Sequence, residues 1–125
     1  MADLKFTTDH EVVYIEGDLA WVGITEYARE ALGDLVFVEL PEVGKQVEKG
    51  SDVAVVESVK TAAEVYAPID GEVVEVNEAL ESDFDLLSTP LEQGGWIAKL
   101  KISNAAQLEE LMDRAAYDEY LKTVD

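Results

Sequence analysis

The chain consists largely of short runs of β-branched and apolar residues that are separated by turn residues. Residues 11–24 form two such runs around Gly17-Asp18, a pair that supplies the positive backbone angle of a tight hairpin turn. Asp70-Gly71 separates two further β-rich runs and predicts another hairpin. Numerous short strands joined by such turns predict a mainly β fold, namely a flattened barrel or sandwich of short antiparallel strands.

Two segments interrupt the β pattern and predict helices. Residues 25–33 predict a short early helix, with Thr25 as its N-cap and Gly33 as its end. After Ser103, apolar residues recur at helical spacing, namely Leu108, Leu111, Met112 and Ala115. This spacing predicts one amphipathic C-terminal helix that is capped by Ser103 or Asn104 and packs on the sheet. Residues 77–95 show no periodicity and predict a long loop.

The composition indicates a folded and strongly acidic protein. Hydrophobic residues make up 48% of the chain, and 28 acidic residues against 9 basic ones give a net charge of −19. Such a charge repels phosphate backbones and anionic lipids, so we expect no nucleic-acid or membrane partner. It favours basic docking sites on partner proteins, and solubility with avoidance of like-charged neighbours is the equally weighted alternative explanation.

Several classes of chemistry are excluded or disfavoured by residue content. The chain has no cysteine, which excludes disulfides, thiolate nucleophiles and cysteine-ligated metals. His10 is the only histidine, and no Gly-x-Ser-x-Gly motif accompanies it, so a hydrolase is not expected. Residues 83–93 lack the alternating ligands and the central glycine of a calcium loop, and we expect no metal site.

The N-terminal residues 1–10 lack a basic start followed by an apolar core, and no apolar run approaches membrane-spanning length. We therefore expect a cytoplasmic protein of a bacterium.

The stretch "VAVVESVKTAAEVYAP", residues 53–68, brings two strand-like runs together at Lys60. A tight reversal usually contains Gly, Asn or Asp, and none is present. A surface lysine could simply form weak salt bridges, each worth below about 1 kcal/mol. A catalytic lysine would need desolvation or cationic neighbours, whereas Glu57 and Glu64 favour the charged amine. A covalent attachment point fits this setting best, because acylation removes the charge and leaves a long arm.

The motifs "ESVK", "GDLVFVELPEVG" and "GEVVEVN" within residues 22–80 resemble those of the glycine cleavage H-protein family, which has the lipoyl/biotinyl-carrier fold. With "TTDHE" near the start and "GGW" near the end, the resemblance covers almost the whole chain. Biotin carriers place Met on both sides of the lysine, whereas Val59 and Thr61 flank Lys60 here. Simple lipoyl domains lack the early and the C-terminal helices.

The resemblance implies a carrier without catalytic activity of its own. It implies one lipoyl-carrier domain over residues 1–125, with a carrier core at about 20–102 and a helical segment at 103–125. Lys60 would carry lipoate in amide linkage, attached by a lipoate ligase or an octanoyl or lipoyl transferase. The arm would take the aminomethyl group of glycine from the pyridoxal-phosphate glycine decarboxylase, the P protein, to the aminomethyltransferase, the T protein. Dihydrolipoamide dehydrogenase, the L protein, would reoxidise the arm, and we expect the carrier to be a monomer.

The resemblance also implies a cleft that holds the loaded arm. Glu11 matches the acid that meets the aminomethyl amine, and Glu64 occupies the position of a second acid that is usually Asp. A carboxylate in such a place would hold an ammonium and shield the adduct from water. His10 also matches the motif, and we interpret it as a structural hydrogen-bonding residue beside the first strand.

Some positions depart from the family pattern. Val12 stands where the family usually has Trp, and the loop at residues 82–93 differs from the usual Pro, Asn and Pro-Tyr. The residues at those loop positions are Phe84, Ser88, Leu91 and Glu92. These departures leave open a diverged homologue that relays lipoyl groups to other complexes. Independently of them, an acidic binding module without a prosthetic group is a third alternative.

Overall fold

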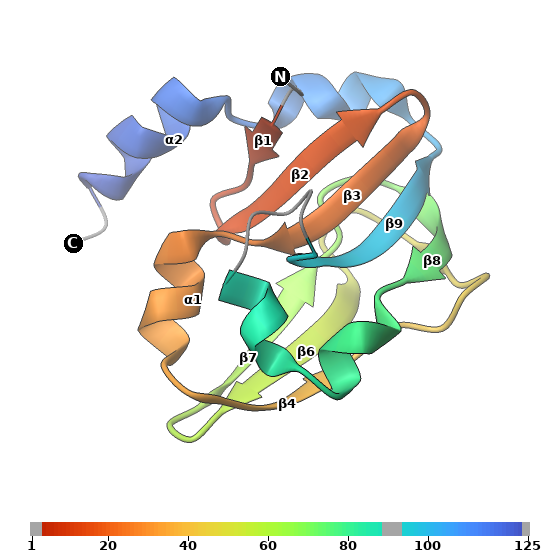
Figure 1. Cartoon of the computed structure of the whole chain (residues 1–125). Helices are drawn as coiled ribbons and strands as arrows, with labels where there is room; N and C mark the ends of the chain where they lie inside the picture. The colour runs from red at the N-terminus through yellow and green to blue at the C-terminus, as the bar shows by residue number, and fades with distance from the viewer. Residues whose placement is uncertain (1–3, 89–93, 124–125) are drawn as a thin grey trace.

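The computed structural model describes residues 4–88 and 94–123, which form two antiparallel β-sheets and flanking helices (Figure 1). The larger sheet has six strands in the order β1 (Leu4–Phe6), β2 (Glu11–Glu16), β3 (Leu19–Ile24), β9 (Trp96–Ile102), β8 (Gly71–Val76) and β5 (Gln46–Val47). The smaller sheet has the order β4 (Leu35–Glu39), β6 (Asp52–Ser58) and β7 (Ala62–Tyr66). The mainly β sandwich is confirmed, and the two sheets do not close into a barrel.

The main hydrophobic core lies between the two sheets. Val22 and Leu100 of the larger sheet and Val38 and Val56 of the smaller one are each at most 1% exposed. Burying one such side chain contributes about 1.5–3 kcal/mol to stability. The core therefore fixes the β6–β7 hairpin firmly against the larger sheet.

The early helix and the first hairpin are confirmed. β2 and β3 pair antiparallel on either side of Gly17, whose φ is 61°. Helix α1 (Glu26–Leu32) begins at Thr25, whose hydroxyl accepts a hydrogen bond from the Ala28 amide at 3.2 Å. Gly33 ends the helix with a φ of 80°.

The hairpin expected at Asp70-Gly71 is wrong. β7 pairs with β6, whereas β8 pairs with β9 and β5, so the chain crosses from one sheet to the other at this point. A Cβ atom on Gly71 would lie 2.6 Å from the carbonyl oxygen of Lys101. Glycine is therefore required here by the close approach of β8 to β9 and not by a tight turn.

The C-terminal helix is confirmed as α2, but it does not begin at Ser103 or Asn104 as one continuous helix. A 3₁₀ helix (Ala105–Glu110) is followed by α2 (Arg114–Leu121), which Asp113 caps by accepting from the Ala116 amide at 2.8 Å. Between them, Met112 and Phe6 exchange backbone hydrogen bonds of 2.7 and 2.8 Å. This pairing with β1 interrupts the helical hydrogen-bond pattern.

The long loop expected at residues 77–95 contains two 3₁₀ turns, Glu78–Glu81 and Phe84–Ser88. Leu80 and Leu87 extend from these turns into the main core and are at most 3% exposed. Burial of these two leucines thus gives local order to a segment that lacks helical periodicity.

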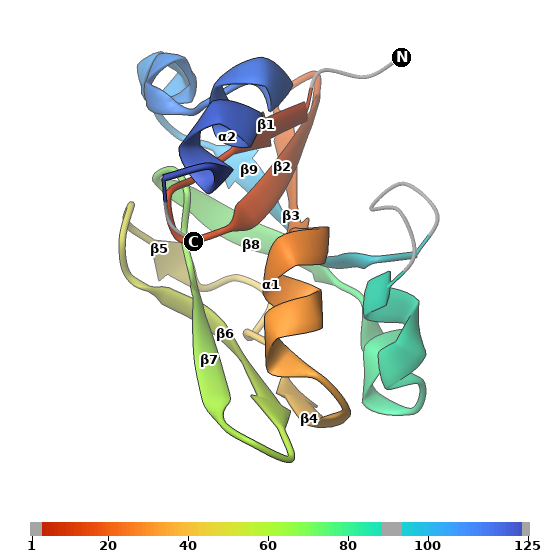
Figure 2. The ribbon, with the colours of Figure 1, turned by 90° about the vertical axis from the view of Figure 1, so that its left-hand side faces the viewer.

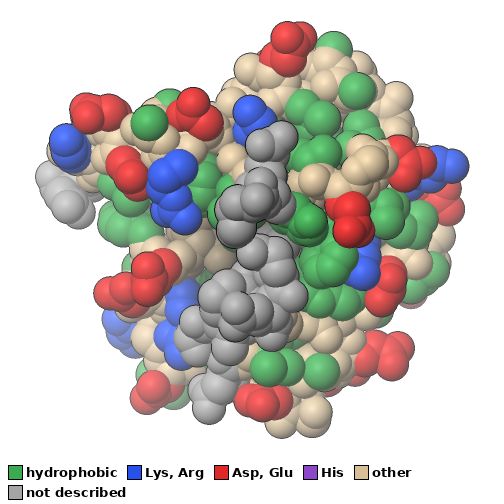
Figure 3. Space-filling view, turned by 45° about the horizontal axis from the view of Figure 1, so that its top comes forward, with side chains coloured by type: hydrophobic (Ala, Val, Ile, Leu, Met, Phe, Trp, Pro, Cys, Tyr) green, Lys and Arg blue, Asp and Glu red, His purple; other side chains and the backbone are tan. Residues whose placement is uncertain are grey.

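Acidic side chains are scattered around the face seen in Figure 3 and do not gather in one patch. Among the described residues, no helix combines the length and apolar character needed to cross a membrane.

Replacing Gly71 by alanine should lower the free energy of unfolding by about 1–3 kcal/mol, because the new methyl group meets the Lys101 backbone. Urea denaturation measures this change. Gly17→Ala is the control, because its Cβ would enter open space and only the left-handed backbone would cost about 1 kcal/mol. A Gly71→Ala protein as stable as the wild type would contradict the close approach of β8 to β9.

Candidate functional site

Lys60 lies at the tip of the β6–β7 hairpin, at the end farthest from the larger sheet (Figures 1 and 2). β6 is the central strand of the smaller sheet, and the Val59 amide donates to the Asp34 carbonyl at 3.0 Å. Val56 and Val65, on the two strands of the hairpin, are buried in the core. The lysine is therefore exposed at the end of a rigid support.

The turn needs no glycine because none of its residues has a positive φ, and Ser58 supplies the acceptor that closes it. Its hydroxyl accepts hydrogen bonds from the amides of Lys60 and Thr61, each at 3.2 Å, and its own amide donates to the Thr61 carbonyl at 2.7 Å. The side-chain oxygen takes the place of a backbone acceptor in the turn. Sequence reasoning missed this residue, although serine in a turn was the available signal.

The Lys60 side chain passes close to Gly33 at the end of α1. A Cβ on Gly33 would lie 3.3 Å from Lys60 Cε and 3.7 Å from Nζ. Within the described part of the chain, no carboxylate forms an ion pair with this ammonium. Gly33 thus both ends the helix and leaves room for the lysine.

Glu11, the first residue of β2, is buried where the two sheets meet and is only 2% exposed. One carboxyl oxygen accepts from the Thr7 hydroxyl at 2.6 Å, and the other accepts from the Tyr66 amide at 3.2 Å. Tyr66 is the last residue of β7, which begins just after the Lys60 turn. The structure therefore places Glu11 at one end of β7 and Lys60 at the other.

Burial raises the pKa of Glu11 to about 7, although the hydrogen bonds from Thr7 and Tyr66 act in the opposite direction. The negative charge of Asp9 adds to the increase. The carboxyl group is thus close to half-protonated at neutral pH. A cation arriving beside it would favour the ionised form.

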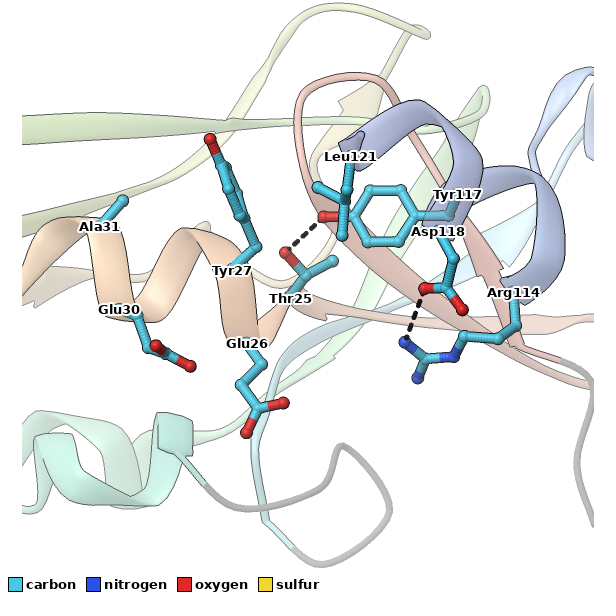
Figure 4. A pocket seen from close by; sticks show the side chains of 9 residues that line it. All are labelled: Thr25, Glu26, Tyr27, Glu30, Ala31, Arg114, Tyr117, Asp118 and Leu121. Atoms are coloured by element: carbon cyan, nitrogen blue, oxygen red, sulfur yellow. Dashed lines mark hydrogen bonds and ion pairs between the residues drawn. The ribbon is translucent and has the colours of Figure 1, made fainter. Parts of the chain in front are cut away.

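Two pockets border this region. A pocket of about 160 Å³ is lined by Glu11 and Tyr66 together with parts of the C-terminal segment. A larger pocket of about 560 Å³ lies between α1 and α2, and Tyr117 reaches across to Thr25 at its inner end (Figure 4). The smaller pocket is the one that contains a residue expected to hold the cargo.

Glu64 lies on the exposed face of β7, opposite Val55 of β6. A hydrogen bond with Asp52 and the charge of that neighbour raise the pKa of Glu64. Glu64 is not among the residues that line the pocket beside Glu11. The side-chain partner of Glu64 is therefore Asp52 and not Glu11.

His10 makes the contacts of a structural residue. Its Nδ1 lies 2.8 Å from the Tyr117 hydroxyl, and its ring centroid lies 4.5 Å from that of Tyr27. Burial lowers the pKa of His10, partly offset by the charge of Asp9. Sequence reasoning did not identify Tyr117, because its contact with His10 joins opposite ends of the chain.

The departures from the family pattern fall in different surroundings. Val12 is 8% exposed and packs with Phe6 and Tyr117 in a small core beside α2. Phe84 packs against the main core, and Ser88 ends the second 3₁₀ turn. Leu91 and Glu92 lie outside the described residues.

Among the described residues, no three or more His, Cys, Asp or Glu side chains lie together so that they could hold a metal ion.

Replacing Glu11 by glutamine should change the pH dependence of stability. Because the folded pKa of about 7 exceeds the ordinary 4.5, the folded state binds more protons between these values, and wild-type stability falls as pH rises through them. Glutamine does not titrate. As pH rises from about 4 to about 8, the free energy of unfolding of Glu11→Gln should therefore increase relative to that of the wild type by up to about 3 kcal/mol. Urea denaturation of both proteins across this pH range measures the difference. A pH-independent difference would mean that Glu11 titrates normally in the folded protein.

Comparison with known proteins gives consistent results. Residues 4–124 match the profile of the family described as Glycine cleavage H-protein. A glycine cleavage system H protein from Xanthobacter autotrophicus is 56% identical over 124 residues, covering 99% of each chain. Another from Phenylobacterium zucineum is 54% identical over 118 residues, covering 94% of this chain and 98% of the relative.

A solved structure shows the same similarity in three dimensions. The crystal structure of a glycine cleavage system H protein from Mycobacterium marinum superimposes with a TM-score of 0.83 at 39% identity. The match covers 98% of this chain and 97% of that one. From its sequence and its structure alike, the chain belongs to the glycine cleavage H-protein family.

Proposed function

We propose that Lys60 carries lipoate in amide linkage and that residues 1–125 act together as one lipoyl-carrier domain. The family to which the chain belongs is that of the non-catalytic carrier of the glycine cleavage system. The chain is accordingly a shuttle for the aminomethyl group of glycine and not an enzyme in its own right.

The observation that carries this proposal is the exposed Lys60 at the tip of a hairpin anchored in the core. The turn is closed by the Ser58 hydroxyl, so the lysine side chain has no part in holding the fold together. Its ammonium has no ion-pair partner among the described residues, and Lys60 is exposed to solvent. These features fit an amide-linked arm, because acylation of Lys60 would break no ion pair.

The prosthetic group would supply the redox-active sulfurs that this cysteine-free chain lacks. The residues of the chain would bind and shield its cargo. Glu11 supports this role, because its carboxyl group is buried, borders a small pocket and has a pKa raised to about 7. An ammonium beside it would shift Glu11 to the carboxylate, and the resulting charge-assisted contact would hold the amine.

Glu64 and His10 have different roles in this proposal. Glu64 lies on β7, between Lys60 and Tyr66 in the chain. It would offer a second carboxyl group along the path of the arm. To contact the cargo, Glu64 would first have to break its hydrogen bond with Asp52. His10 would support the neighbouring Glu11 and not contact the cargo.

The partners follow from family membership. We propose that the carrier meets the P protein, the T protein and the L protein in turn, after a lipoate ligase or an octanoyl or lipoyl transferase has modified Lys60. A net charge of −19 favours partner surfaces that are basic, and it disfavours nucleic acid and anionic lipid. We further propose that the protein works as a monomer in the bacterial cytoplasm.

Lys60→Ala should abolish modification without affecting the fold. Intact mass spectrometry of the protein expressed in lipoate-replete cells should show a lipoyl addition on the wild type and none on this variant. Lys45→Ala, which removes another exposed lysine, should keep the addition. An unmodified wild-type protein, or a Lys60→Ala protein that still carries the group, would contradict the proposal.

A further inference from the structure

The C-terminal helix α2 reaches the Glu11 region through one hydroxyl group. Tyr117 is 1% exposed, and its Oη lies 2.8 Å from His10 Nδ1 and 2.8 Å from Thr25 Oγ1. Figure 4 shows the tyrosine pointing from α2 toward Thr25 at the start of α1. Its ring stacks on Phe6 with centroids 4.7 Å apart. One side chain thus joins α2, α1 and the turn before β2.

The turn that Tyr117 contacts has an unfavourable backbone conformation. His10 has a φ of 70°, and it is the only non-glycine residue with a positive φ in the described part of the chain. Such a conformation costs free energy and persists only where the surrounding structure imposes it. The backbone of His10 donates to the Thr7 carbonyl at 3.1 Å and accepts from the Thr25 amide at 2.9 Å. The contact with the Tyr117 hydroxyl restrains the side chain of His10.

The same turn determines where the Glu11 carboxyl group lies. The Thr7 hydroxyl donates to Glu11 Oε1 and accepts from the Glu11 amide at 3.1 Å, while the Thr7 amide donates to the Glu11 carbonyl at 3.0 Å. His10 lies between these two residues in the chain. A change in the backbone of His10 would therefore move Thr7 away from Glu11 and admit water to the carboxyl group.

We propose that Tyr117 is a positioning residue for the cargo site, because its hydroxyl holds the His10 turn in the left-handed conformation and so keeps Glu11 enclosed against the end of β7. The inference rests on the proposed function for the purpose of Glu11. On this account, α2 belongs to the carrier site and is not only a cover for the sheet.

The test uses the unmodified protein, so it does not depend on lipoylation. Tyr117→Phe keeps the ring and its stacking on Phe6 and removes only the hydroxyl. Carbon-13 NMR of the carboxyl groups should show the pKa of Glu11 falling from about 7 toward the ordinary 4.5, by about one unit or more, as water enters. His10 is the only histidine, so its imidazole signals are unambiguous, and its lowered pKa should rise.

Other titratable groups surround the two that are followed. They are Asp9 on the same turn, Tyr66 at the end of β7, Tyr27 on α1, Tyr120 and Arg114 on α2, and the paired Lys49 and Glu110 that line the pocket beside Glu11. None of them is changed by Tyr117→Phe. The expected shifts therefore report on the enclosure of Glu11 and His10.

A second variant separates positioning through His10 from general packing. In His10→Gly, the positive φ carries no strain and the imidazole is absent, so adding Tyr117→Phe should produce no further shift in the pKa of Glu11. Tyr14→Phe is the matched control, since its ring meets Trp21 at 5.4 Å on another part of β2 and should leave Glu11 unchanged.

The outcomes are distinct. A Glu11 pKa in Tyr117→Phe that stays at the wild-type value, or the same shift with and without His10→Gly, would overturn the positioning role. Wild-type protein that is not lipoylated at Lys60 would overturn the proposed function. The titrations would still show whether Tyr117 positions Glu11, because they do not depend on lipoylation.

Discussion

The contact between Glu11 and the end of β7 joins the two sheets beside the proposed cargo site. One carboxyl group accepts a hydrogen bond from Thr7 of its own sheet edge and one from the Tyr66 amide of the other sheet. The contact is buried, and burial raises the pKa of the carboxyl group to about 7. Because β7 leads directly from this contact to the Lys60 turn, the same strand sets the geometry of the proposed attachment point and of the proposed cargo site.

The strength of this arrangement comes from the sandwich core beneath it. The inward residues of β6 and β7 are packed against the larger sheet, while Lys60 extends beyond the last buried pair. The Ser58 hydroxyl closes the turn locally. A carrier needs both properties, since the arm must move while its base stays fixed.

Features with local causes could be predicted from the sequence. Thr25 and Gly33 marked the ends of α1, Gly17-Asp18 marked the first hairpin, and the run around Lys60 marked its turn. The same local reasoning was wrong at Gly71, because the glycine is required by the approach of β9, a strand distant in sequence.

Features with non-local causes could not be predicted. The C-terminal helix is interrupted because Met112 pairs with Phe6, about one hundred residues earlier. The enclosure of Glu11 and the contact between His10 and Tyr117 likewise depend on residues brought together only by the fold. Sequence similarity named Glu11, His10 and Glu64 together, whereas the structure gives each a different partner.

We propose that this chain carries the aminomethyl group of glycine on an arm at Lys60. Glycine–bicarbonate exchange with the cognate glycine decarboxylase measures this function, using lipoylated wild-type protein and unmodified Lys60→Ala. We expect exchange that depends on the amount of the lipoylated wild type and none above background with the variant. A fully lipoylated wild-type protein that supports no exchange would contradict the claim and leave a lipoyl relay as the function.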